Sequence, residues 1–325
     1  MNTRIKNSFL FGVMLLLLAL VGTIQSWNVS LAILNLCLIS AIMTMGVNIQ
    51  YGYAGVFNVG VMGFTALGGI AAVIISMPPV QSAWQAGGHR AMLGLFLGAI
   101  SIVLVVVVWK KTARMRRIRF WLTGLMMIVG YSLMRIVIDP AIVAIEAVEP
   151  AKTGFLGGFG LPIMFSWIVG GAFAAAVAWV VGKVSLGLRS DYLAIATLGI
   201  SEIIIYFIKY EEWLTRGVKN VNGIPRPVPY EIDLQNTLWL QEWAERFEIP
   251  VIELSSIIVK ISYASLFITV LLVIFYLSET ALKSPWGRMM RAIRDNETAA
   301  NAMGKNIMWR HLQVFVLGSA VVGMA

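Results

Sequence analysis

Long apolar runs separated by short polar segments dominate the chain. The apolar runs lie at about residues 8–26, 29–50, 55–76, 92–109, 120–138, 163–183, 191–208 and 256–281, and a ninth begins near residue 312. A helix needs about 20 mostly apolar residues to cross the hydrocarbon core of a bilayer. The pattern therefore predicts an all-α polytopic membrane protein with about eight complete transmembrane helices and the start of a ninth.

Composition agrees with this fold class. Apolar residues make up 59% of the chain and charged residues only 13%, whereas about a quarter of an ordinary soluble domain is charged. The net charge of +9 does not indicate nucleic-acid binding, because the basic residues flank the apolar runs. A single cysteine, Cys37, and two distant histidines, His89 and His311, argue against a disulfide framework and a metal site.

The distribution of basic residues predicts the orientation. The first apolar run follows Arg4 and Lys6 and lacks a small-residue cleavage site, so it is predicted to be an uncleaved first span. With a cytoplasmic N-terminus, the predicted inner loops are 51–54, 110–119, 184–190 and 282–311, and the outer loops include 139–162 and 209–255. The bases KKTARMRRIR at 110–119 then lie inside, as the positive-inside rule requires of a multi-pass inner-membrane protein.

Glycines and amides crowd the segment 48–69, NIQYGYAGVFNVGVMGFTALGG. Glycine permits close helix packing, but this density with amides equally fits a broken helix that lines a polar path. The sequence leaves both interpretations open. The candidate pathway residues in this segment are Asn48, Tyr51, Gly55 and Asn58.

Glu202 is a further pathway candidate, because an ionisable group inside a span is costly and often functional. Local pairing with Tyr206 or Lys209 would explain it as a structural anchor instead. Arg135 and Asp139 are four residues apart and are predicted to form an ion pair.

Two further patterns predict packing surfaces. Small residues recur every four positions at Gly170, Ala174, Ala178 and Gly182, which predicts close contact with a neighbouring helix. In the loop 210–255, the prolines of PRPVP predict an extended path. A short helix should follow with Trp239, Leu240, Trp243 and Phe247 on one face, suited to the membrane interface.

The segment 283–310, KSPWGRMMRAIRDNETAANAMGKNIMWR, is basic and amphipathic. On a continuous helical wheel one face holds Met289, Ile293, Ala300, Met303 and Gly304, and the other holds Arg288, Arg291, Arg294 and Lys305. Such a segment between two apolar runs indicates a surface offered to a soluble cytoplasmic partner. The alternative is a basic loop that only sets topology.

No phosphate-binding motif accompanies these features. The Gly-Lys pairs at 182–183 and 304–305 lack both the upstream glycine and the following Ser or Thr of a P-loop. The chain is therefore predicted not to be an enzyme, and uphill transport would draw energy from a partner or an ion gradient.

The run GRMMRAIRDNETAANAMG resembles the cytoplasmic signature of ATP-binding-cassette importer permeases, with Ala299, Ala300 and Gly304 at its small-residue positions. The longer pattern GRMMRAIRDNETAA, residues 287–300, resembles the M-type subunit of the branched-chain amino acid permeases. NIQYGYAGVFNVGVMGF, SDYLAIATLGISEII and LTRGVKNVNGIPRP resemble further blocks of that family, so the likeness extends from about residue 31 onward. The chain departs from the family at three places. It lacks a proline at 314–317, and its stretch 77–121 with the basic cluster looks atypical. The spans that normally follow the signature are missing, so the chain looks C-terminally truncated.

The resemblance implies a single transmembrane permease domain, 1–325, with an extracytoplasmic loop at 210–255 and a cytoplasmic coupling segment at 283–310. The implied ATPase-coupling residues are Gly287, Arg288, Arg291, Arg294, Glu297, Ala299, Ala300 and Gly304. Asp295 or Asn296 would cap the short helix that enters the ATPase, and Gly304 would end it. The arginines would pair with acids on the partner or with membrane lipid.

The implied partners are a second permease subunit in a heterodimer, two cytoplasmic ATP-binding-cassette ATPases that hydrolyse ATP, and a periplasmic amino-acid-binding protein. The chain itself would bind no cofactor. Branched-chain or similar hydrophobic amino acids would be the substrate. A urea or short-amide permease, an ion-driven secondary transporter and an intramembrane enzyme are the alternatives that the sequence leaves.

Overall fold

The computed structural model describes residues 3–112, 116–150 and 153–325, and these residues form helices without a β-sheet. The all-α prediction is therefore confirmed. By its internal contacts the chain divides into two compact units. The first unit holds residues 1–72, 162–204 and 225–325, and the second holds 73–161 and 205–224.

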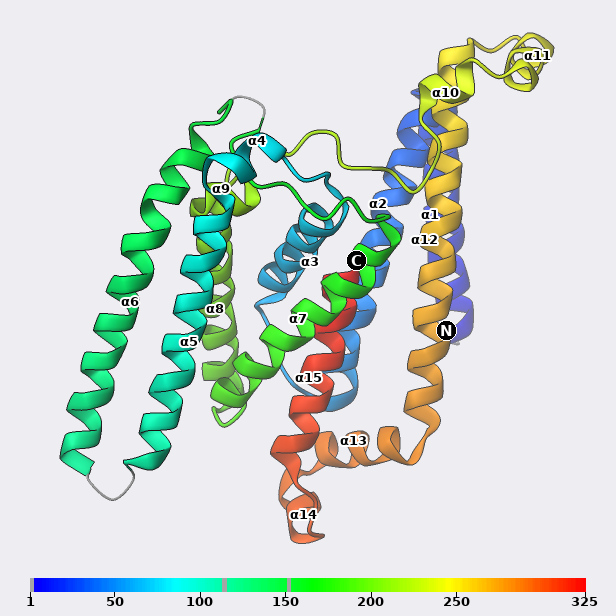
Figure 1. Cartoon of the computed structure of the whole chain (residues 1–325). Coiled ribbons are helices and arrows are strands. Elements are labelled where there is room, and N and C mark those ends of the chain that lie inside the picture. The colour runs from blue at the N-terminus through cyan, green and yellow to red at the C-terminus, as the bar shows by residue number, and fades with distance from the viewer. Residues whose placement is uncertain (1–2, 113–115, 151–152) are drawn as a thin grey trace. The chain divides into compact units, whose positions relative to one another are not determined.

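The first unit contains most of the helices (Figure 1). They are α1 (Thr3–Ile24), α2 (Trp27–Asn48), the π-helical turn η1 (Ile49–Tyr53), α7 (Met164–Ser185), α10 (Glu231–Gln235), α11 (Leu238–Phe247), α12 (Val251–Lys283), α13 (Pro285–Asp295), α14 (Glu297–Ala302) and α15 (Ile307–Met324). Two helices, α3 (Val61–Ser76) and α8 (Ser190–Tyr210), begin in this unit and end in the second.

The second unit is built around a helical hairpin of α5 (His89–Lys111) and α6 (Arg116–Glu146). Its short elements are α4 (Gln81–Ala83), the π-helical turn η2 (Trp84–Gly88) and α9 (Glu212–Thr215). The ion pair predicted on α6 is present, since Arg135 Nε lies 2.9 Å from Asp139 Oδ1.

Apolar helices occupy all nine predicted positions. Among the described residues, seven helices are long and apolar enough to cross a membrane, and Ser8–Ile24 and Val61–Ser76 are shorter apolar helices. The predicted third span was wrong at its start, because α3 begins at Val61 and not at residue 55. The preceding residues leave the helix for an irregular path, which is described below.

The small-residue stripe on α7 packs against α15, as predicted. Ala174 and Ala178 are fully buried. A Cβ atom on Gly170 would lie 2.9 Å from the Gly323 carbonyl oxygen, and one on Gly182 would lie 2.6 Å from Leu312 Cδ1. Larger residues would therefore push the two helices apart.

The short helix α11 carries an aromatic face. The rings of Trp239 and Trp243 lie 6.2 Å apart and those of Trp243 and Phe247 lie 6.1 Å apart, and all three side chains are exposed. The prediction that Leu240 shares this face was wrong. Leu240 is fully buried in a cluster with Ala244 and Leu254, where α11 packs against α12. It anchors α11 to α12, and the aromatic face stays free.

Candidate functional site

A tight corner joins α12 to α13. The Ser284 hydroxyl accepts a hydrogen bond from the Gly287 amide at 3.4 Å, and Pro285 occupies the first helical position. A Cβ atom on Gly287 would lie 2.3 Å from the Leu282 carbonyl oxygen, so only glycine fits there. The corner lays α13 crosswise between α12 and α15 (Figure 1).

One face of α13 is anchored in the core of the first unit. Met290 and Ile293 are fully buried. They belong to the same cluster as Ala54, Val56 and Leu193. The amphipathic interpretation of this part of the segment is therefore confirmed, and α13 is a packed element rather than a loose loop.

The three arginines of α13 bond to backbone carbonyls of the chain itself. Arg288 Nη1 donates to the Lys283 carbonyl at 3.2 Å, and Arg291 Nη2 donates to the Leu282 carbonyl at 3.4 Å. Both carbonyls lie at the C-terminal end of α12, where cations offset the helix dipole. Arg294 Nη1 donates to the Gly52 carbonyl in η1, and its Nη2 lies 3.3 Å from Asp295 Oδ1.

The helix breaks at Asn296, so the single helical face predicted for 283–310 was wrong. Asn296 adopts an extended conformation, with φ of −157° and ψ of 98°, and its side chain accepts from the Ala299 amide at 2.9 Å. It caps α14, whereas Asp295 pairs with Arg294. Met303 is 80% exposed and lies on no common face with Met289 and Ile293, because the break changes the helix direction.

Gly304 ends α14, as predicted. Its φ of +74° is a left-handed conformation that glycine adopts without strain. The Gly304 amide donates to the Asn301 carbonyl at 2.9 Å, and the Lys305 amide donates to the Ala300 carbonyl at 3.2 Å. This pair of bonds is a Schellman motif. The requirement for glycine is conformational, since a Cβ atom there would meet nothing within 4 Å.

The capped helix α14 exposes small side chains. Ala299 is exposed, and Ala300 is half-buried against the core cluster that holds α13. Glu297 Oε1 lies 3.9 Å from His311 Nε2 on α15. Beside α14 lies an open depression of about 500 Å³, lined by Asn301, Gly304, Lys305, Asn306, Ile307 and Met308.

A second feature is the irregular segment between α2 and α3. The Val56 amide donates to the Gln50 carbonyl at 3.0 Å, and Gly55 has a φ of +72°. The Asn58 amide group donates to Gln50 Oε1 at 2.9 Å. A helix break is therefore present in the segment 48–69, at residues 55–60, whereas the polar path that the break would line stays a prediction.

Gln50 is the centre of a buried polar network that sequence reasoning missed. Its side chain is 1% exposed. Its Nε2 donates to the Phe315 carbonyl at 2.8 Å and to the Ser319 hydroxyl at 3.0 Å, both on α15. Such bonds satisfy the polar groups that a helix break leaves within a membrane protein.

Two hydroxyls of α8 complete this arrangement. The Val59 amide donates to Thr197 Oγ1 at 3.2 Å, and the Gly63 amide donates to Ser201 Oγ at 2.7 Å. Thr197 and Ser201 are four residues apart on one buried face of α8. That spacing was the sequence signal that could have identified them.

The predicted pathway residues occupy different environments. Asn58 is buried in the polar network, whereas Asn48, Tyr51 and Gly55 are exposed. A Cβ atom on Gly55 would lie 3.2 Å from Arg294 Cγ, so this glycine lies beside α13. Glu202 is exposed on α8, and no ion pair joins it to another of the described residues.

The larger part of the chain matches a known protein family. Residues 122–325 match a protein family described as "Branched-chain amino acid transport system / permease component". The matched range includes α7, α8 and α12 to α15. The likeness of the segment 48–69 to a family block lies outside this range and stays a prediction.

Two relatives illustrate the similarity. The high-affinity branched-chain amino acid transport system permease protein LivM of Escherichia coli (strain K12) is 28% identical over 169 residues, which cover 51% of this chain and 39% of that protein. A probable branched-chain amino acid transport permease protein LivM of Methanocaldococcus jannaschii is 28% identical over 157 residues, which cover 47% of this chain and 38% of that protein. The chain therefore spans about two fifths of the length of these relatives. No solved structure matches it.

Proposed function

Because the chain belongs to the family of branched-chain amino acid transport permease components, we propose that it is a permease subunit of an ATP-driven importer for branched-chain or similar hydrophobic amino acids. The observation that carries this proposal is α14, a short helix capped by Asn296 and ended by Gly304. It presents small exposed side chains between two membrane-length helices, α12 and α15.

The α13–α14 segment is suited to couple an ATPase to the membrane helices. Ala299 and Gly304 let a partner approach the backbone of α14 closely. The buried side chains Met290 and Ile293 fix α13 to the core, and Arg294 reaches the carbonyl of Gly52. A push on α14 would therefore reach both α12 and the broken segment 49–60.

The energy would come from partner subunits. The sequence has no P-loop of its own, so two cytoplasmic ATP-binding-cassette ATPases would bind and hydrolyse ATP. A second permease subunit would complete the pore. A periplasmic binding protein would deliver the amino acid to the side that carries the loop 210–255, where the aromatic face of α11 is exposed.

The broken segment and Glu202 are the proposed parts of the pathway. Irregular backbone in a membrane is tolerated where protein or water covers it. An ionised carboxylate facing lipid is costly, so the exposed Glu202 face of α8 would be covered by the second permease subunit or would line the path. Movement of α13 would reach this region through Arg294 and Gly52.

The orientation is part of the proposal. A coupling segment must lie in the cytoplasm with the ATPases. The bases of α13 and of 110–119 would then lie inside, and so would the N-terminus. The proposed location is the inner membrane of a bacterial cell.

The test is co-purification followed by transport. The full chain is purified from membranes of cells that carry its genomic neighbours, and mass spectrometry identifies the proteins that accompany it. The complex is then reconstituted with ATP inside the vesicles and assayed for uptake of leucine and of urea. The proposal would be supported if cassette ATPases accompany the chain and if leucine uptake by the complex depends on ATP. Uptake of urea alone would refute the substrate class, and uptake driven by an ion gradient without an ATPase would refute the importer.

A further inference from the structure

Two small-residue contacts hold α5 close to α6 in the second unit. A Cβ atom on Gly98 would lie 2.8 Å from Met134 Sδ, and one on Gly130 would lie 2.5 Å from Ser101 Cβ. Larger side chains of both helices lie on either side of this contact line. The hairpin therefore has open grooves between its helices.

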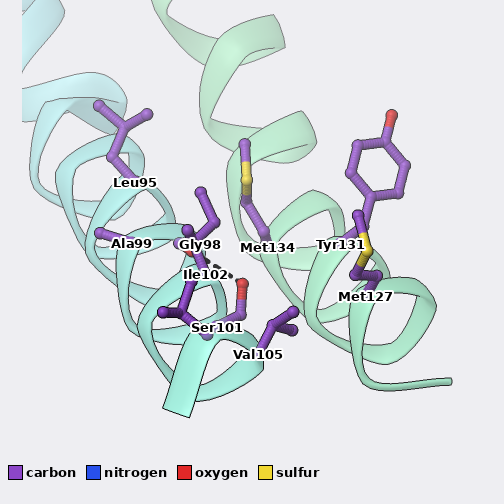
Figure 2. Close-up of a pocket in the computed structure, with 10 residues that line it drawn as sticks. Leu95, Gly98, Ala99, Ser101, Ile102, Val105, Met127, Tyr131 and Met134 are labelled. Carbon is purple, nitrogen blue, oxygen red and sulfur yellow. Dashed lines mark hydrogen bonds between the residues drawn. The ribbon is translucent and has the colours of Figure 1, made fainter. Parts of the chain in front are cut away.

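The larger groove has a volume of about 510 Å³ and is almost entirely apolar (Figure 2). Leu95, Ile102 and Val105 line it from α5, and Met127, Tyr131 and Met134 line it from α6. The Ser101 hydroxyl, which also lines the groove, donates to the Gly98 carbonyl at 2.7 Å, so it is satisfied within the helix. Such a groove favours a hydrocarbon chain.

The groove points toward a cationic helix end. Val106, at the end of the groove, is one helical turn from Lys110 and Lys111, and both lysines are exposed. Arg119 on the first turns of α6 lies over the Trp109 ring at 3.5 Å from its centroid. Its Nε is buried and has no hydrogen-bond partner among residues 3–112, 116–150 and 153–325.

Aromatic side chains frame the same end. Trp109 is half exposed, and Phe120 and Trp121 are exposed at 69% and 77%. Tryptophan is enriched where membrane helices meet the headgroup layer. The tip of the hairpin therefore has both the polarity and the charge of a surface that contacts phospholipid headgroups.

The length of the groove fits an acyl chain of a lipid. From Leu95 to Val106 the groove follows eleven residues of α5, or about 16 Å at 1.5 Å per residue. That length accommodates most of one acyl chain. Anionic headgroups are attracted to clustered Lys and Arg beside a membrane helix.

We propose that the hairpin holds one anionic phospholipid, with an acyl chain in the groove between α5 and α6 and the headgroup on Lys110, Lys111 and Arg119. Arg119, which is half-buried over the Trp109 ring, adds its positive charge to that of the two exposed lysines. This site does not depend on the proposed transport function. Its α5 side precedes the residues that match the permease family, and its α6 side, from Met127 onward, lies within them.

The test is native mass spectrometry of the full chain, purified and mixed with equal amounts of a phosphatidylglycerol and a phosphatidylethanolamine of the same acyl composition. The wild-type chain should retain phosphatidylglycerol preferentially. The variant K110Q/K111Q/R119Q should lose about tenfold or more of that preference. Arg90→Gln, at the other end of α5 and also exposed, is the matched charge control and should keep it.

The groove is tested separately by filling it. Ala99 lines the groove and is exposed, so Ala99→Trp should block the acyl chain without disturbing the core. Ile102→Trp is a second filling variant. Val103→Trp is the control, because Val103 is 60% exposed and lines neither groove of the hairpin. The filling variants should reduce retention of both lipids several-fold, and Val103→Trp should not.

Two results would overturn the proposal. One is lipid binding that does not change in the variants. The triple variant would keep its preference for phosphatidylglycerol, or both filling variants would retain lipid as the wild type does while eluting normally on gel filtration. The other comes from a photoreactive amino acid at position 99 in membranes. Crosslinking to a protein segment rather than to lipid would show that a helix occupies the groove.

Discussion

Arg294 in α13 donates a hydrogen bond to the carbonyl of Gly52 in the π-helical turn η1. This contact joins residues 242 positions apart in the sequence. It links the segment proposed to meet an ATPase with the broken helix proposed to line the pathway. Loss of this hydrogen bond should weaken the coupling between α13 and the broken segment more than it affects their folding, because Met290 and Ile293 still anchor α13.

The first prediction concerns this link. Arg294→Gln should lower ATP-driven uptake by about 10-fold or more, since hydrogen bonds to charged groups contribute about 1.5–3 kcal/mol. Vesicle uptake and ATPase assays on the same sample measure the effect. The ATPase rate should stay measurable while uptake falls. Arg246→Gln on α11 is the control, and equal losses in both variants would contradict the prediction.

The second prediction concerns the left-handed residue that ends α14. Gly304→Val should disrupt the Schellman motif, because a left-handed conformation costs a side-chain-bearing residue about 1–2 kcal/mol and β-branching adds to this cost. Gly304→Asn should be tolerated better, since asparagine adopts this conformation more readily. Co-purification with the ATPase is the measurement. A valine variant that binds as well as the asparagine variant would be the contrary result.

The third prediction separates docking from stability. Ala299 is exposed, so Ala299→Trp should change the free energy of unfolding by no more than about 0.5 kcal/mol. It should nevertheless block close approach of a partner and abolish uptake. Ile232→Trp on α10, at a position that is 70% exposed, is the control. Normal uptake in the Ala299 variant would remove α14 from the docking surface.

The fourth prediction concerns the buried network. Gln50→Leu should lower the melting temperature clearly, because it removes the acceptor of the buried Asn58 amide, which costs about 1–3 kcal/mol. Asn48→Leu, at an exposed position two residues earlier, should have little effect. Thermal unfolding in detergent, followed by intrinsic fluorescence, compares the two. Similar melting temperatures would show that the network contributes no stability.

The fifth prediction concerns orientation. A reporter that is active only in the cytoplasm should be active when fused at residue 115 and inactive at residue 230, because the basic residues of 110–119 favour the inner side. Residue 115 lies outside the described residues, so this prediction rests on the sequence. The reverse pattern would invert the proposed topology.

The helices were predictable because a membrane span is defined by the length and composition of an apolar run, both of which are local properties. The glycine-rich break was predictable only as one of two interpretations, since the glycines and amides within 48–69 also fit close helix packing. The caps at Asn296 and Gly304 follow from residue types with strong positional preferences.

The polar contacts were not predictable from the sequence. Gln50 bonds to Ser319, 269 positions away, and nothing near Gln50 indicates that partner. The arginines of α13 were expected to reach outward, but the corner at Gly287 brings the carbonyls of Leu282 and Lys283 within their range. Leu240 was misplaced because a list of apolar residues does not reveal which of two faces meets α12.

The corner at Gly287 has a mechanical consequence. Gly287 packs so close to the last turn of α12 that a methyl group would not fit, so we expect α12 and α13 to rotate together at this corner. Their 33 and 11 residues correspond to lengths of about 50 and 16 Å. If the two helices rotate together about the corner, a displacement at the free end of α13 becomes about three times larger at the far end of α12.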